Sequence, residues 1–80
     1  MIYNQMQQEY DNFCHNITWL RKHHHLSKKE MAKLLGISIG SLNKIESGQI
    51  PPRMTTEVLT QANKHFGIPI HNLFGSRLGK

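Results

Sequence analysis

The segment from Leu26 to Gly48 predicts two short helices joined by a tight turn. Ser27 can cap the first helix by accepting a backbone N–H bond, and Glu30, three residues later, can reach back to the N–H of Ser27. Gly36 follows the last apolar residue of this helix, at a point where the chain commonly needs a positive φ that glycine adopts without steric cost. The first helix should therefore begin at residue 28 and end just before Gly36.

The apolar residues of this segment recur at helical spacing, so each helix should turn one face to a core. Ser38 is placed to cap the second helix and Gly48 to end it. Ala32 stands where the two helices must approach each other, which requires a small side chain. The residues expected to face inward are Met31, Leu34, Leu35, Leu42 and Ile45.

These residues resemble the helix-turn-helix of the Cro and phage-repressor (XRE-like) family. The positions that carry the resemblance are Ala32, Gly36, Ile37, Leu42 and Ile45, together with Ile17, Leu20 and Arg21 upstream and Glu46, Ser47, Gly48, Pro51 and Pro52 downstream. The similarity covers residues 12–74. It implies an all-α, compact, five-helix, lambda-repressor-like DNA-binding domain, with the helix-turn-helix proper at residues 28–47.

The first predicted helix is longer than this resemblance requires. Its apolar stripe steps by three or four residues along Met6, Tyr10, Phe13, Ile17 and Leu20. Residues 1–11 should therefore extend the helix at its N-terminus. This extension could fold back on its own domain, contact a second copy or a partner protein, or be disordered. Residues 75–80 are expected to form a flexible tail.

The positive charge is concentrated around the predicted helix-turn-helix. Residues 21–53 contain seven lysines and arginines against two glutamates, which accounts for the whole net charge of +5. A basic patch on such a motif favours double-stranded DNA as the partner.

The resemblance also implies which residues meet DNA. Residues 38–47 should form the recognition helix and lie in the major groove, while the preceding helix crosses the backbone. The expected base contacts come from Ile39, Gly40, Asn43 and Lys44. Ile39 could touch a thymine methyl group, Asn43 could pair with an adenine edge and Lys44 could approach a guanine. Expected phosphate contacts come from Lys28, Lys29, Ser38, Ser41, Lys44 and Arg53.

A structural role is expected for Arg21 and Glu46. They occupy the positions of a family ion pair that ties the first helix to the end of the recognition helix. A partly buried charge needs its partner, so loss of either residue should destabilise the domain.

Other residues that could carry chemistry have simpler structural explanations. The single cysteine, Cys14, cannot form an intramolecular disulfide and should be a half-buried structural thiol. The run from His23 to His25 projects in several directions rather than converging on a metal, and its position suits the end of a helix. The sequence thus predicts no cofactor, no metal site and no enzymatic activity.

The sequence also bears on location and function. No apolar run approaches the roughly 20 residues needed to span a bilayer, and the first residues lack a signal-peptide pattern. A cytoplasmic, nucleoid-associated location is therefore expected, as for a bacterial or phage protein. The leading hypothesis is a sequence-specific transcriptional regulator, a repressor that acts as a homodimer. The alternative is an antitoxin-like or protein-interaction module of the same fold that binds a partner through residues 1–11.

Overall fold

The protein is built from helices alone over the residues that the structure describes. The computed structural model describes residues 5–49 and 56–79, and only the backbone of residues 5, 6 and 56. The helices are α1 (Gln5–His23), α2 (Lys28–Leu35), α3 (Ile39–Glu46), α4 (Thr56–Phe66) and α5 (Ile70–Gly75). The expected all-α fold of five helices is confirmed.

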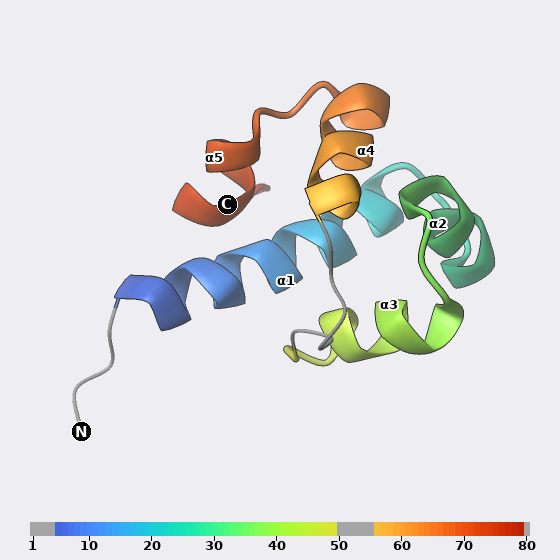
Figure 1. The fold of residues 1–80 in the computed structure, drawn as a ribbon, viewed down its shortest axis with the longest axis horizontal. Coiled ribbons are helices and arrows are strands. Elements are labelled where there is room, and N and C mark those ends of the chain that lie inside the picture. The colour runs from blue at the N-terminus through green and yellow to red at the C-terminus, as the bar shows by residue number, and fades with distance from the viewer. Residues whose placement is uncertain (1–4, 50–55, 80) are drawn as a thin grey trace.

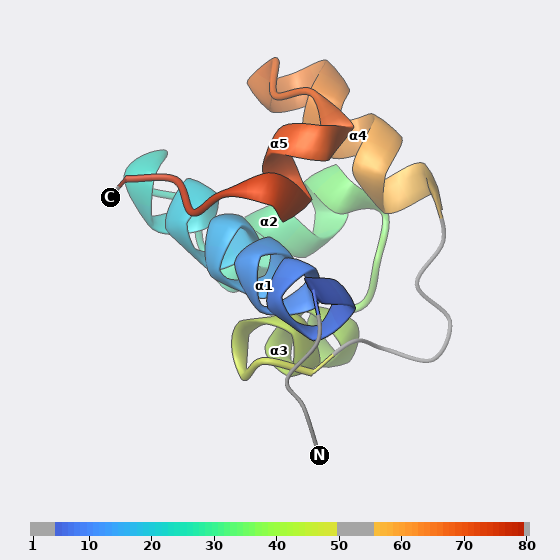
Figure 2. The ribbon, with the colours of Figure 1, turned by 90° about the vertical axis from the view of Figure 1, so that its left-hand side faces the viewer.

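The long helix α1 is the centre of the arrangement. It lies between α3 on one side and α5 on the other, as Figures 1 and 2 show. The helix α2 packs against both α3 and α4, and α4 contacts α5. Among the described helices, α3 packs mainly against α1 and α2, and its remaining face is exposed.

The core is made where these helices meet. Each of the five helices contributes to it, and Phe13 of α1 also stacks on the ring of Phe74 with a centroid distance of 5.0 Å. Burial of a large apolar side chain stabilises a fold by roughly 1.5–3 kcal/mol. The buried apolar residues are Phe13, Cys14, Ile17, Leu20, Met31, Ala32, Leu35, Leu42, Ile45, Val58, Ala62 and Leu73.

The start and the end of α2 follow the sequence pattern. The Glu30 N–H donates to Ser27 Oγ at 3.0 Å, and the Ser27 N–H donates to Glu30 Oε1 at 2.8 Å, which is a complete capping box. Gly36 has a φ of 75°, and the Ile37 N–H donates to the Ala32 carbonyl at 3.0 Å. The predicted cap and turn are therefore confirmed.

The turn between α1 and α2 uses a histidine where glycine is favoured. His25 has a φ of 57°, in the left-handed region. The Leu26 N–H donates to the Arg21 carbonyl at 2.9 Å, which closes the last turn of α1. A side chain in this conformation costs about 1 kcal/mol relative to glycine, so the closing contacts must offset that strain.

The segment after α5, for which the sequence suggested a flexible tail, makes hydrogen bonds with α1. Asn16 is fully buried, and its Nδ2 donates to the carbonyls of Leu73 and Ser76 at 2.7 and 2.8 Å. Its Oδ1 accepts the N–H of Leu78 at 2.7 Å. These bonds hold residues 76–78 against α1, because a buried amide and the backbone groups around it need partners.

A second asparagine of α1 strengthens this attachment. Asn12 Nδ2 donates to the Phe74 carbonyl at 2.9 Å, and Arg77 Nε donates to Asn12 Oδ1 at 3.2 Å. The side chain of Leu78 also packs on the core. Both polar and apolar contacts therefore fix the segment that follows α5.

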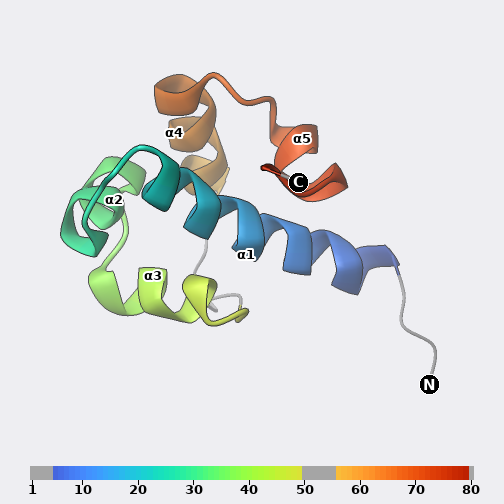
Figure 3. The same cartoon turned by 180° about the vertical axis from the view of Figure 1, so that it is seen from behind.

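The N-terminal extension continues α1 as a straight helix in the residues that can be described. Figure 3 shows the first turns of α1 projecting past the other helices. Gln7, Gln8 and Tyr10 are exposed, and burial on α1 begins at Asn12. Residues 1–4 lie outside the described part of the chain.

Candidate nucleic-acid interface

A serine caps the start of α3. Ser38 Oγ accepts the N–H of Ser41 at 3.0 Å and donates to Ser41 Oγ at 3.1 Å. The backbone of Ser38 is extended, as an N-cap requires, and the helix starts at Ile39. The cap expected from the sequence is therefore present, and it sets which residues stand at the exposed start of α3.

One face of α3 is fixed by apolar packing. Leu42 and Ile45 are fully buried against the core. They are three residues apart, so they lie on the same side of the helix. This packing prevents rotation of α3 about its axis, and it fixes which residues are turned away from the core.

An ion pair anchors the end of the same helix to α1. Arg21 Nε donates to Glu46 Oε2 at 2.6 Å, and Arg21 Nη2 donates to Glu46 Oε1 at 3.0 Å. Arg21 Nη1 also donates to the Leu26 carbonyl at 3.1 Å. The two side chains are only 15% and 9% exposed, so this two-point pair is shielded from solvent. The bond to Glu46 raises the pKa of Arg21, which keeps the guanidinium charged.

The opposite face of α3 is open to solvent. Ile39 is 44% exposed, and Gly40, Asn43 and Lys44 are exposed as well. Residues 39 and 43, like residues 40 and 44, are one helical turn apart, so the four positions form a continuous exposed face. Among the described residues, the side chain that a Cβ at position 40 would meet is that of Ser38, at 3.8 Å, so the lack of a side chain at Gly40 leaves the backbone accessible.

The start of α2 adds cations beside this face. Lys28 and Lys29 are exposed, and Lys28 Nζ donates to Asn43 Oδ1 at 2.9 Å. Ser41 is half-buried. The structure thus brings together Lys28 and the exposed face of α3, whereas Arg53 lies outside the described residues.

A comparison with known families agrees with this geometry. A family model described as Helix-turn-helix (HTH_3) matches residues 17–71, which is more than half of the chain. The chain belongs to this helix-turn-helix family. The resemblance to Cro and XRE-type domains is thereby confirmed, and with it DNA binding by a domain class that is not enzymatic. Searches of curated proteins and of solved structures found no match.

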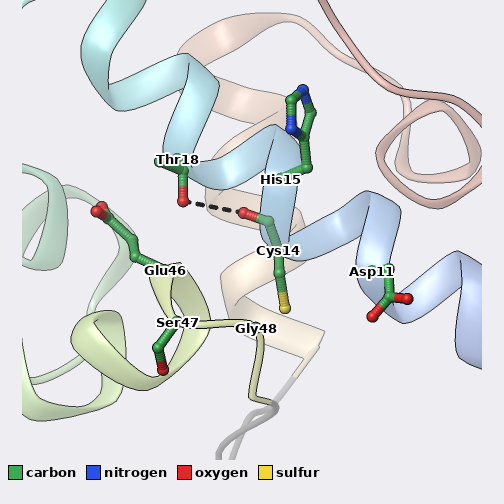
Figure 4. Close-up of a pocket in the computed structure, with 7 residues that line it drawn as sticks. All are labelled: Asp11, Cys14, His15, Thr18, Glu46, Ser47 and Gly48. Atoms are coloured by element: carbon green, nitrogen blue, oxygen red, sulfur yellow. Dashed lines mark hydrogen bonds between the residues drawn. The ribbon is translucent and has the colours of Figure 1, made fainter.

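The helix-turn-helix domain also contains a pocket between α1 and the end of α3, shown in Figure 4. Its volume is about 360 Å³, and Thr18 Oγ1 donates to the Cys14 carbonyl at its wall at 3.1 Å. Burial, with a smaller contribution from the negative charge of Asp11, raises the pKa of the Cys14 thiol to about 11. The thiol is therefore protonated at neutral pH and is a poor nucleophile. The pocket is lined by Asp11, Cys14, His15, Thr18, Glu46, Ser47 and Gly48.

The described part of this helix-turn-helix domain contains neither a candidate metal site nor a candidate membrane span. No group of three or more His, Cys, Asp or Glu side chains there is arranged to hold a metal ion. The ring of His23 instead stacks on Trp19, with a centroid distance of 4.4 Å, and His24 packs on Phe66. No described helix is long and apolar enough to cross a membrane.

Some residues that position this helix-turn-helix domain were missed by reasoning from the sequence. Asn12 and Asn16 fix α5 and the following segment, yet asparagine on an apolar stripe gives no periodic signal. Asn16 lies three residues after Phe13, which could have marked it as inward-facing. The bond from Lys28 to Asn43 joins residues that are far apart along the chain, so spacing alone could not indicate it.

Proposed function

We propose that this protein is a sequence-specific regulator of transcription that places α3 in the major groove of double-stranded DNA. The observation that carries the proposal is the division of α3 into a buried face and an exposed face. Leu42 and Ile45 are fully buried, while Ile39, Asn43 and Lys44 are accessible. An α-helix fits the major groove, and such a division leaves one side free to meet base edges.

The exposed positions suit different contacts. Ile39 offers apolar surface to a thymine methyl group, and Gly40 allows close approach of the backbone. Asn43 and Lys44 carry the groups on this face that can hydrogen-bond to bases. Phosphate contacts would come from the cations and hydroxyls that border the face, which are Lys28, Lys29, Ser38 and Ser41, together with Arg53.

We infer that the protein acts as a homodimer and represses transcription. A helix of eight residues is about 12 Å long, so one α3 can read only a few base pairs. Two copies on half-sites about one helical turn apart double the recognised sequence. A dimer bound over a promoter would exclude RNA polymerase from the same DNA, and the place of action would be the nucleoid in the cytoplasm.

Selection of bound duplexes from a random pool at two salt concentrations tests the proposal. The expected result is a palindromic consensus, with affinity that falls steeply as salt rises because phosphate contacts release counterions. Binding should be cooperative on a full palindrome and much weaker on a single half-site. Steep salt dependence without any consensus would contradict sequence-specific regulation, and equal binding to one half-site would contradict the dimer.

A further inference from the structure

The hydrogen bond from Lys28 to Asn43 joins the two helices of the helix-turn-helix at the exposed surface. Lys28 is the first residue of α2, and Asn43 lies on the exposed face of α3. The distance from Nζ to Oδ1 is 2.9 Å, and the donor carries a positive charge. Charge-assisted bonds of this kind are stronger than bonds between neutral groups. The capping box holds the backbone at the start of α2, so the origin of the Lys28 side chain is fixed.

This bond changes what Asn43 can offer to DNA. An asparagine that reads adenine uses both ends of its amide, because Oδ1 accepts from N6 of adenine and Nδ2 donates to N7. In this structure the Oδ1 end already accepts from Lys28. The Nδ2 end of the planar amide points away from that contact, and it can only donate.

We propose that Lys28 is a positioning residue for base specificity. It restricts Asn43 to donating hydrogen bonds and so directs Asn43 to guanine rather than adenine. Guanine presents two acceptors, N7 and O6, in the major groove, which match a donor-only amide. The amide oxygen has a second lone pair, but the adenine N6 amino group would have to donate to it beside the positive ammonium group of Lys28, which disfavours that approach. This inference rests on the proposed reading of DNA by α3, and it replaces the adenine contact that the sequence suggested for Asn43.

The neighbouring residues of α3 have the same character. Lys44 is also a donor without an acceptor, and Ile39 and Gly40 have no hydrogen-bonding side chain. The carboxylate of Glu46 accepts from Nε and Nη2 of Arg21 and is only 9% exposed. The side chains of the exposed face therefore offer donors and apolar surface. The expected half-site has guanine opposite Asn43 and Lys44 and thymine opposite Ile39.

The experiment is duplex selection with the wild-type protein and three variants. Asn43→Ala identifies the base pair that Asn43 reads, because the preference at that position should be lost. Lys28→Met removes the ammonium group but keeps much of the side-chain bulk. It should shift that one position from guanine towards adenine by roughly tenfold in relative affinity. Lys29→Met is the matched control, since it removes a neighbouring exposed cation without a contact to Asn43, and it should lower affinity without changing any base preference.

The outcomes separate this inference from the proposed function. If the wild-type consensus has adenine at the base pair that Asn43 reads, the inference is overturned, while sequence-specific binding still holds. A Lys28→Met variant that loses affinity equally for all sequences would also overturn it, because Lys28 would then be a phosphate contact only. If neither the wild-type protein nor any variant enriches a DNA sequence, the proposed function is overturned, and the inference with it. Melting curves of the four proteins should agree, which shows that each is folded.

Discussion

The two faces of α3 differ in how many contacts determine them. The inner face is held by Leu42 and Ile45 in the core and by the two-point pair between Arg21 and Glu46. On the outer face, Ile39 and Lys44 are exposed to solvent. Among the described residues, the one side-chain hydrogen bond from this face to another helix is that between Lys28 and Asn43. The inner face therefore specifies where the helix lies, whereas the outer face is free to specify what it reads.

This difference implies that stability and recognition can be changed separately. Changes on the inner face alter packing or a shielded charge, which are among the few mechanisms with large effects on stability. Changes on the outer face remove groups that water can solvate, so they should leave folding nearly unaffected. The following substitutions test that separation, from the largest expected effect to the smallest.

The largest effect is expected from Ile45→Ala on the inner face. Loss of a fully buried side chain leaves a cavity and should lower the free energy of unfolding by about 3 kcal/mol. The matched control is Ile39→Ala, the same change at a side chain that is 44% exposed, which should cost less than about 0.5 kcal/mol. Urea denaturation measures both. Similar losses for the two variants would break the distinction between the faces.

Removal of the ion pair should have the next largest effect. Glu46→Ala leaves the Arg21 guanidinium, 15% exposed, without its carboxylate. We expect a loss of about 2 kcal/mol, less than for a fully buried pair because water still reaches part of the site. Glu57→Ala, at an exposed glutamate of α4, is the control. An unchanged melting temperature for Glu46→Ala would show that the pair adds nothing to stability, and a changed base preference would show that it acts on the reading face.

On the outer face, Lys44→Ala should weaken DNA binding without affecting the fold. The expected loss of binding free energy is about 1–2 kcal/mol, because one donor to a base or phosphate is removed. The dependence of affinity on salt should become shallower if the lost contact is to phosphate. Lys33→Ala removes the same charge from an exposed position on α2 and serves as the control in the same titrations. Equal losses for the two variants would mean that only net charge matters.

Much of the helix-turn-helix scaffold could be predicted from the sequence because its signals are local. Ser27, Glu30 and Gly36 act within one helical turn of their partners, and their spacing alone indicated the cap and the turn that the structure contains. The apolar pair of Leu42 and Ile45 follows from helical periodicity. The Arg21 and Glu46 pairing came from the family resemblance, since nothing local connects these two positions.

The parts that could not be predicted depend on polar contacts between distant segments. Asn16 bonds to residues more than 50 positions later, and a polar residue in a core is specified by partners that the sequence does not place beside it. The contacts of the segment after Gly75 with α1 were not predicted for this reason, because its own composition gives no sign of the amides that bond to it. The link between Lys28 and Asn43 is of the same kind, and the proposed contact of Asn43 with guanine rests on it.

The smallest effect is expected at the start of α2, which belongs to neither face of α3. The backbone N–H of Ser27 donates to Glu30 and lowers the pKa of this carboxyl group. A carboxyl group with a lowered pKa in the folded state stabilises the fold above the pKa of the unfolded chain, and this contribution is lost as the pH falls through the folded-state value. Glu30→Gln retains an acceptor but cannot ionise, so the small stability difference from wild type should disappear in acid. Carboxyl chemical shifts and urea denaturation across the acid range measure both quantities. Titration of Glu30 above the usual range of glutamate would contradict the capping box, and a changed base preference in Glu30→Gln would show that the start of α2 also controls the outer face through Lys28.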